Sequence, residues 1–326
     1  MATYKGIQGF KIQSRDGDPD NPIVGDFYYD STGKKFKVVK DGGASIGTWA
    51  SGGNLNTARH YIAAARNAPQ SASMAFSGYN SGAKNETEKY DGTSWTEVNN
   101  LNTSRAGPGG AGTQTAALCM SGTPYSPDSN ARTSNVESYD GTNWTEVGDV
   151  VTGMAWMGSL GTNTAAMMIG GDSSGGTATA NSQTFNGSSW TEGNDLPGAV
   201  IGNSSTGTTT AGLNAGAESA PYRDCQTYNG TSWTEVNNTN GSHGYGAMFG
   251  TQTAAIITAD YPAAVITESW DGTSWTEVAD LSTSRYGLAG TGASNAGIAM
   301  GGGPSPQNVT EEWTADDYQI KTVTTS

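Results

Sequence analysis

Short apolar runs that alternate with turn residues dominate this chain. A typical run covers residues 115–122, where Ala, Leu, Cys and Met lie between a Gly- and Thr-containing turn and a Ser-Gly pair. Runs of this length, bounded by Gly, Asn, Asp and Ser, are typical of β-strands joined by tight turns. The pattern predicts an all-β protein with many short strands.

The runs belong to a repeat that a tryptophan marks. The marker recurs every 42 to 49 residues, and Tyr318 stands at its place in the last unit. From the second unit on, an aromatic residue lies five positions before the marker position, and a Glu or Gln lies two positions earlier still. Ten positions after the marker, three units carry an arginine, for which we expect a structural or solvated role. The markers are Trp49, Trp95, Trp144, Trp190, Trp233 and Trp275.

Each unit predicts four strands, named a to d in chain order. A "GTQT"-like turn joins strands a and b, a variable loop joins b and c, and Asp-Gly or Asn-Gly joins c and d. Asp-Gly favours a two-residue type I′ turn, which would place Tyr90 opposite Thr93 and Glu88 opposite Trp95. We then expect the Tyr and Trp rings to meet diagonally and Glu88 to accept the indole N–H. The side chains of this c–d hairpin would then have a structural role and help one unit to pack against the next.

Units of this size with four strands have the dimensions of propeller blades. Gly-Gly at the end of strand b, an aromatic residue before the c–d turn and a Trp after it resemble kelch repeats, although fewer residues than usual separate the aromatic residue from the Trp. The stretch "SWTEVNNLNTSR", followed by "GTQTAAL", is similar to kelch-like repeats in tail-fibre and virion proteins of marine bacteriophages, cyanophages especially. The resemblance covers residues 47–320. With six a–b units, it implies a six-bladed kelch-like β-propeller in residues 49–326, whose last c–d connection, at Thr314-Ala315, turns differently.

Residues 1–48 form a segment of different composition. They contain "GDFYYDSTGKKFKVV", which resembles a β-hairpin element found near the ends of phage fibre proteins. We interpret them as a short N-terminal β attachment segment. The alternatives are a seventh blade or a strand that closes the ring.

Charge separates the two parts of the chain and limits its partners. Of the net charge of −14, residues 1–49 contribute +1 and residues 50–326 contribute −15. An acidic body repels phosphate backbones, so we expect no nucleic-acid partner. No apolar run approaches the ~18 residues of a membrane span, and the N-terminus has no apolar region of a signal peptide.

No motif points to catalysis or to a cofactor. The stretch from Ser138 to Trp144 is close to the Asp box of sialidases, but one residue is missing between Asp and Gly, and the Asp box is itself a structural turn. His60 and His243 lie far apart in sequence and belong to no catalytic pattern. Cys119 and Cys225 lack metal-ligand spacing and are expected to be buried free thiols. We therefore expect no enzyme, no catalytic residue and no cofactor.

One weak metal candidate lies in the N-terminal segment. Asp16, Asp18 and Asp20 occupy the first acidic positions of an EF-hand-like loop, but the required Gly and the closing Glu are absent. A charged loop stiffened by proline is the simpler interpretation.

Loop lengths indicate where binding takes place. The distance from the marker to the a–b turn is 17 residues throughout, so the length differences fall in the b–c loops. In a propeller these loops share one face with the d–a loops, and variable loops on a rigid scaffold carry recognition. Tyr among Ser, Gly and Asn is typical of adaptable binding surfaces, although the tyrosines can instead pack the loops. The candidate binding residues are Tyr79, Tyr125, Arg132, Tyr222, Arg223 and Tyr261.

Together these features predict a phage virion protein, a tail fibre or appendage. The N-terminal segment would bind other virion proteins, and the propeller would recognise a host-surface glycan or protein receptor. The alternatives are a purely structural decoration or adaptor protein of the virion, and a cellular kelch-type lectin or scaffold. A glycan-cleaving propeller enzyme is disfavoured because clustered acids and bases are absent from the sequence.

Overall fold

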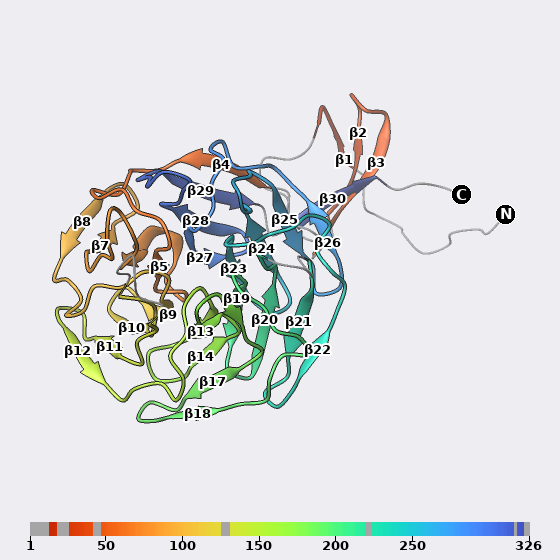
Figure 1. The fold of residues 1–326 in the computed structure, drawn as a ribbon. Helices are drawn as coiled ribbons and strands as arrows, with labels where there is room; N and C mark the ends of the chain where they lie inside the picture. Colours follow the sequence, from red (N-terminus) through yellow and green to blue (C-terminus); the bar gives the residue numbers. More distant parts are fainter. Residues whose placement is uncertain are drawn as a thin grey trace.

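The chain forms a disk of six sheets arranged around a central axis, with a smaller sheet beside it (Figure 1). The computed structural model describes residues 13–17, 26–41, 47–124, 131–218, 223–315 and 318–322. In every blade the strands are antiparallel and follow the order a, b, c, d from the axis outward. The prediction of an all-β, six-bladed propeller is confirmed.

The first three blades contain one chain segment each. Blade I consists of β5 (Ala63–Ala64), β6 (Met74–Phe76), β7 (Thr87–Tyr90) and β8 (Trp95–Val98), with the 3-10 turn η1 (Gln70–Ala72) between the first two strands. Blade II consists of β9 (Gly109–Thr113), β10 (Ala116–Met120), β11 (Val136–Tyr139) and β12 (Trp144–Val147). Blade III consists of β13 (Gly158–Gly161), β14 (Ala166–Ile169), β17 (Ser182–Phe185) and β18 (Trp190–Glu192); β15 (Asp172–Ser174) and β16 (Thr177–Ala178) form a hairpin in its b–c loop.

The next two blades follow the same plan, and the last is completed from the other end of the propeller. Blade IV consists of β19 (Ser204–Thr208), β20 (Ala211–Ala215), β21 (Cys225–Tyr228) and β22 (Trp233–Glu235). Blade V consists of β23 (Ala247–Gly250), β24 (Ala255–Thr258), β25 (Thr267–Trp270) and β26 (Trp275–Glu277). Blade VI consists of β27 (Ala289–Ala293), β28 (Ala296–Met300), β29 (Thr310–Ala315) and β4 (Gly47–Ser51).

Strand β4 closes the ring, because the earliest strand of the propeller becomes the outer strand of its last blade. Trp49 pairs with Trp313, and Gly47 pairs with Ala315. This pairing covers a sheet edge that would otherwise be open. The expectation that the chain turns at Thr314-Ala315 and places Tyr318 at the marker position is wrong, because Trp49 already occupies the place opposite Trp313.

Strands from the N-terminal and C-terminal parts of the chain form the smaller sheet. It contains β1 (Gln13–Arg15), β2 (Phe27–Asp30), β3 (Lys35–Asp41) and the C-terminal strand β30 (Tyr318–Thr322). This sheet lies outside the ring of blades, so residues 1–48 form no seventh blade (Figure 1). The C-terminal strand pairs with β3, an arrangement that a sequence division at residue 48 does not anticipate.

The c–d hairpins use a four-residue loop, and the predicted two-residue turn is wrong. Tyr90 pairs directly with Trp95, and Glu88 pairs with Glu97. The Asp91 carboxylate accepts hydrogen bonds from the backbone N–H groups of Thr93 and Ser94, both at 2.8 Å. This side-chain cap stabilises the longer loop and lowers the pKa of Asp91, with Ser94 the main cause. The facing rings still pack together, with centroids 5.0 Å apart.

Each marker tryptophan packs against the preceding blade. Trp144 belongs to a core cluster with Met74, Phe76 and Leu101 of blade I. Its indole N–H donates to Thr87 Oγ1 on strand c of that blade, at 3.1 Å. The expectation that the Glu or Gln of the same hairpin accepts this proton is therefore wrong, since the indole points into the neighbouring blade.

The Glu and Gln residues of strand c have another partner: the residue ten positions after the preceding marker. Arg59 binds Glu88 at 2.8 Å, with both side chains at most 1% exposed. Arg105–Glu137, Arg285–Glu311 and His243–Glu268 repeat the contact. In the two blades where strand c carries a glutamine, Gln183 or Gln226, the residue ten positions after the preceding marker is apolar, Met154 or Val200. A carboxylate on strand c is thus matched by Arg or His on the other side, and a neutral Gln by an apolar residue, because an unpaired buried charge is costly.

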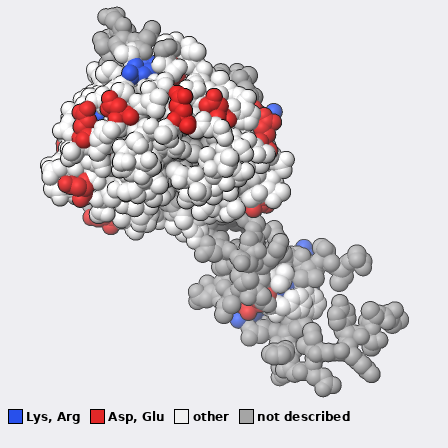
Figure 2. All heavy atoms as spheres, turned by 90° about the horizontal axis from the view of Figure 1, so that it is seen from below, with Lys and Arg blue, Asp and Glu red and all other residues white. Residues whose placement is uncertain are grey.

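Acidic side chains lie mainly on the outside of the disk. Figure 2 shows Asp and Glu in a row along its edge. Each of the five complete c–d hairpins carries an exposed Glu on strand d, namely Glu97, Glu146, Glu192, Glu235 and Glu277. In the described parts of the chain, no helix is long and apolar enough to cross a membrane.

Candidate functional site

A closed ring of backbone hydrogen bonds surrounds the axis where strands a begin. The six residues twelve positions after the markers each donate their N–H to the carbonyl of the same position in the preceding blade, at 2.6 to 2.9 Å. All six have a positive φ, between 50° and 72°. In order they are Tyr61, Gly107, Trp156, Gly202, Tyr245 and Gly287.

Aromatic residues and glycines alternate around this ring because the space between blades requires it. A Cβ on Gly107 would lie 2.5 Å from Cδ1 of Trp156, and a Cβ on Gly287 would lie 2.9 Å from Cδ1 of Tyr61. Each glycine thus makes room for the aromatic ring of the next blade. Three large rings therefore meet at the axis, on the face that carries the d–a and b–c loops.

Further aromatic side chains extend this group outward. Tyr261 packs edge-on against Tyr286, with centroids 5.0 Å apart, and lies 5.9 Å from Tyr245. The His60 ring stacks on Tyr79 at 5.4 Å. Burial lowers the pKa of His60, which is therefore neutral at physiological pH. We call the whole group the central aromatic cluster: His60, Tyr61, Tyr79, Trp156, Tyr245, Tyr261 and Tyr286.

Solvent reaches most rings of the cluster. His60 is buried, the tyrosines and Trp156 are half-buried or exposed, and Tyr261 is 43% exposed. Buried aromatic rings only support a fold, whereas half-exposed rings at the middle of a face can stack on a ligand.

Charged groups at the edge of the cluster are paired and hydrogen-bonded. Arg132 forms a 2.5 Å ion pair with Asp172, and its guanidinium lies 4.8 Å from the centre of the Trp156 ring. The Tyr245 hydroxyl donates to Glu218 Oε2 at 2.8 Å. Burial is the main cause that raises the pKa of Tyr245, and the nearby Glu218 carboxylate adds to it, so this phenol stays neutral.

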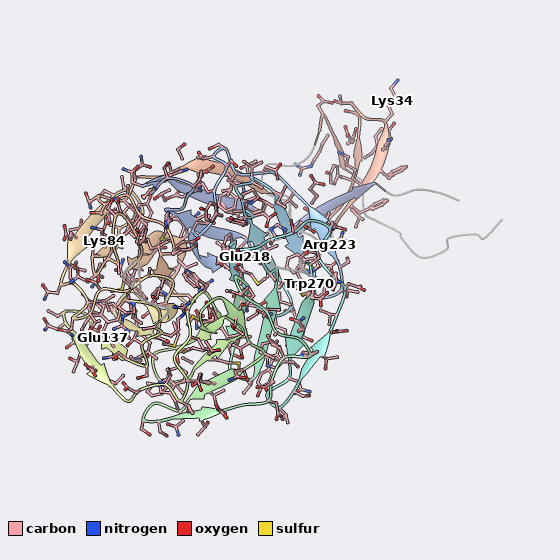
Figure 3. The ribbon with its side chains drawn as sticks, viewed as in Figure 1. Lys34, Lys84, Glu137, Glu218, Arg223 and Trp270 are labelled. Atoms are coloured by element: carbon pink, nitrogen blue, oxygen red, sulfur yellow. The ribbon has the colours of Figure 1, made fainter. Side chains whose placement is uncertain are left out.

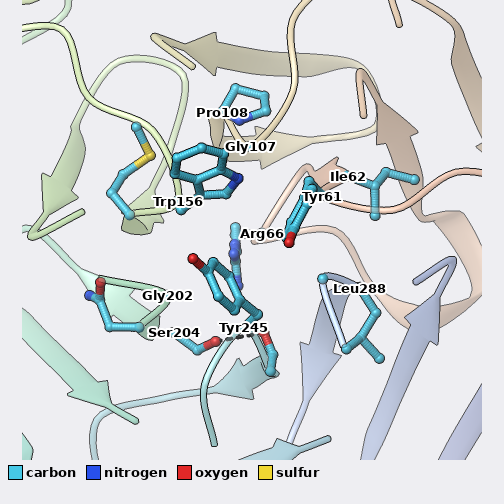
Figure 4. Close-up of a pocket in the computed structure, with 14 residues that line it drawn as sticks. Tyr61, Ile62, Arg66, Gly107, Pro108, Trp156, Gly202, Ser204, Tyr245 and Leu288 are labelled. Atoms are coloured by element: carbon cyan, nitrogen blue, oxygen red, sulfur yellow. Dashed lines mark hydrogen bonds between the residues drawn. The ribbon is translucent and has the colours of Figure 1, made fainter. Parts of the chain in front are cut away.

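A small pocket of about 50 Å³ lies at the axis among the ring residues. Tyr61, Trp156 and Tyr245 line it, together with Arg66 from blade I. In Figure 4, Arg66 lies between the rings of Tyr61 and Tyr245, with Trp156 beside them. The pocket admits a small group, while the aromatic cluster offers a wider surface above it.

The structure brings three of the six predicted binding residues together. Tyr79, Arg132 and Tyr261 belong to the central aromatic cluster or its edge. Arg223 is exposed and donates to the carbonyl of Asn240, and Figure 3 shows it farther from the middle of the disk than Glu218. Tyr125 and Tyr222 lie outside the described residues.

The metal candidate gains no support. Asp16 accepts a hydrogen bond from the Ser31 hydroxyl, while Asp18 and Asp20 lie outside the described residues. Among the residues that the structure describes, no group of three His, Cys, Asp or Glu side chains is arranged to hold a metal ion.

Sequence reasoning missed the residues at the axis, which come from the uniform d–a segments. Tyr61, Trp156 and Tyr245 alternate with glycine at one fixed offset from the marker, and this row is visible in the sequence. Trp156 is also the one tryptophan of nine outside the c–d hairpin positions. Loop-length variation indicates the b–c loops, and it marks neither the alternation of aromatic residues with glycine nor the unusual position of Trp156.

Comparison with known proteins supports the architecture. The chain is similar to a solved structure titled "Structure of YjhT", with a TM-score of 0.67 and 12% sequence identity over 83% of this chain and 99% of that chain. The likeness establishes the fold alone. No family model matches the chain, and no curated protein matches it.

Proposed function

We propose that this propeller is a non-catalytic binding module of a phage virion, which recognises a host-surface glycan through its central aromatic cluster. The virion role rests on the repeat resemblance described above. The observation that supports recognition is the gathering of half-exposed rings at the axis of one face.

The chemistry of the cluster favours a carbohydrate ligand. The faces of sugar rings carry C–H groups that stack on Tyr and Trp, while their hydroxyls need donors and acceptors at the edge. Arg132, Asp172 and Glu218 supply such groups next to the rings. Arg132 and Asp172 are paired with each other and Glu218 already accepts the Tyr245 hydroxyl, so the site suits a neutral polar ligand better than a reaction that needs a free acid and base.

The chain topology supports attachment from the opposite side. The smaller sheet connects to the propeller at Gly47 and at Ala315, which are paired neighbours at the c–d end of blade VI. The aromatic cluster lies at the d–a and b–c end. A segment that binds the particle would therefore leave the recognition face free.

Calorimetric titration of the full chain with purified host envelope polysaccharide tests the recognition claim. We expect Tyr261→Ala to weaken binding at least tenfold, because it removes an exposed ring of the cluster. Phe27→Ala is the matched control, since Phe27 is 45% exposed but lies in the smaller sheet. Equal binding by wild type and Tyr261→Ala would contradict the proposal, and binding to a host protein but not to the polysaccharide would make the ligand a protein receptor.

Incorporation of a shortened chain tests the attachment claim. Removal of residues 1–41 deletes β1, β2 and β3 but keeps the closing strand Gly47–Ser51. We expect a folded propeller that no longer joins the particle. Normal incorporation would refute attachment through this segment.

A further inference from the structure

Blade I departs from the other blades at the position where strand a ends. Seventeen residues after the marker, five blades carry a glycine with positive φ and blade I carries Arg66. The η1 turn replaces the tight a–b turn of the other blades. The five glycines are Gly112, Gly161, Gly207, Gly250 and Gly292.

The Arg66 side chain lies in the pocket at the axis (Figure 4). Its Nη1 donates to the carbonyl of Met248, on strand a of blade V, at 3.4 Å. Its Nε is buried without a hydrogen-bond partner, although the side chain as a whole is half-buried. The guanidinium of this pocket-lining residue thus keeps an unused hydrogen-bond donor.

Arg66 differs from the three fully buried arginines of the propeller in lacking a carboxylate partner. Arg59, Arg105 and Arg285 each bind a buried Glu. Among the described residues, no carboxylate oxygen lies within 4.0 Å of the Arg66 guanidinium. Burial lowers the pKa of Arg66 to about 10, which leaves the group charged at neutral pH. A buried charge without a counter-charge is unfavourable, so a partner from solution is favoured.

We propose that the axial pocket binds a small monovalent anion, of the size of chloride, as the counter-ion of Arg66. The volume of about 50 Å³ suits such an ion and excludes large organic anions. The pocket also contains Asn203, whose Oδ1 is a buried acceptor without a partner; this atom is suited to water beside the anion. The hydroxyl of Ser204 is already engaged with the Gly246 carbonyl. The inference does not depend on the glycan proposal, because it rests on Arg66 and on the size of the pocket, although Tyr61, Trp156 and Tyr245 line the pocket and also belong to the central aromatic cluster.

Thermal unfolding in sodium chloride and in sodium gluconate, at equal ionic strength, tests the proposal. Gluconate is too large for the pocket, so wild type should show a saturable rise of Tm with chloride only. Arg66→Met should lose this dependence. Arg223→Met, which removes an exposed arginine, should retain it. Equal chloride dependence in wild type and Arg66→Met would overturn the proposal.

Anomalous diffraction from wild-type crystals soaked in bromide gives a second test that needs no variant. We expect a bromide peak within hydrogen-bonding distance of Arg66. Water alone in the pocket at saturating bromide would overturn the proposal, even if Arg66→Met fails to fold.

Discussion

Replacement of Arg59 by Met should destabilise the propeller strongly, because Glu88 would remain buried without its counter-charge. Both side chains are at most 1% exposed, and their closest oxygen and nitrogen atoms are 2.8 Å apart. Loss of one partner of a buried ion pair costs about 3–5 kcal/mol. With an m-value near 3 kcal/mol/M, the midpoint of urea unfolding should fall by roughly 1–1.7 M.

Another blade of the same chain shows which second substitution should compensate for the loss of Arg59. Blade III has Met154 and Gln183 at the positions of Arg59 and Glu88. Gln183 Oε1 accepts the backbone N–H groups of Val151 and Thr152, just as the Glu88 carboxylate accepts those of Asn56 and Thr57. Glutamine can therefore keep the loop contacts without a charge. We expect the double variant Arg59→Met/Glu88→Gln to recover all but about 1–2 kcal/mol of the loss.

Equilibrium urea unfolding, followed by tryptophan fluorescence, measures all three proteins. A repeat architecture can unfold in steps, so the m-values of wild type and variants must agree before midpoints are compared. A double variant as unstable as Arg59→Met alone would refute the charge-matching explanation.

Three further predictions concern the ring, the hairpin loops and the thiols. Gly107→Ala should lower the free energy of unfolding by about 2 kcal/mol or more, because Gly107 has a φ of +59° and a Cβ there would meet Trp156. The control is Gly198→Ala, which has open space around its Cβ and should unfold at the same Tm as wild type. Equal destabilisation of the two variants would contradict the packing of the ring. Backbone hydrogen bonds lower the pKa of Asp91, Asp140 and Asp271 in the folded state. The three carboxylates therefore stabilise the folded protein at pH values above their pKa in the unfolded chain. This stabilisation is lost as the pH falls through their pKa in the folded protein. The triple Asp→Asn variant should therefore lose less Tm than wild type as the pH is lowered from about 4.5 to 2.5, and parallel curves would refute this. Burial raises the pKa of Cys119 and Cys225 to about 12, so neither thiol should react with Ellman's reagent at pH 8 until the chain unfolds, and rapid labelling of the native protein would count against the burial.

The repeat made the propeller predictable because it is a local signal copied along the chain. The offsets of Trp95, Trp144 and their equivalents define strand number, blade number and the face that carries each loop. Ring closure was harder to predict, because the pairing of Trp49 with Trp313 joins distant parts of the chain and no local pattern records it. The hairpin register failed for a different reason: the Asp91 carboxylate caps two backbone N–H groups, and this stabilises a loop longer than Asp-Gly alone suggests.

The candidate site was predicted only in part. Tyr79, Arg132 and Tyr261 are in variable loops, where length differences directed attention. Tyr61, Trp156 and Tyr245 lie in segments of constant length, and only their alternation with glycine marks them. The meeting of these rings at the axis follows from sixfold closure, so their role emerges once the blades are placed side by side.

Recognition of a glycan by the central aromatic cluster is tested most directly by ¹⁹F NMR of protein labelled with 5-fluorotryptophan and titrated with host envelope polysaccharide. Eight of the nine tryptophans lie in the c–d hairpin positions, and only Trp156 belongs to the central aromatic cluster. Replacement of Trp156 by Phe assigns its resonance. We expect the Trp156 signal to shift saturably while the hairpin signals stay in place. Saturable binding with an unchanged Trp156 signal would contradict recognition through the central aromatic cluster.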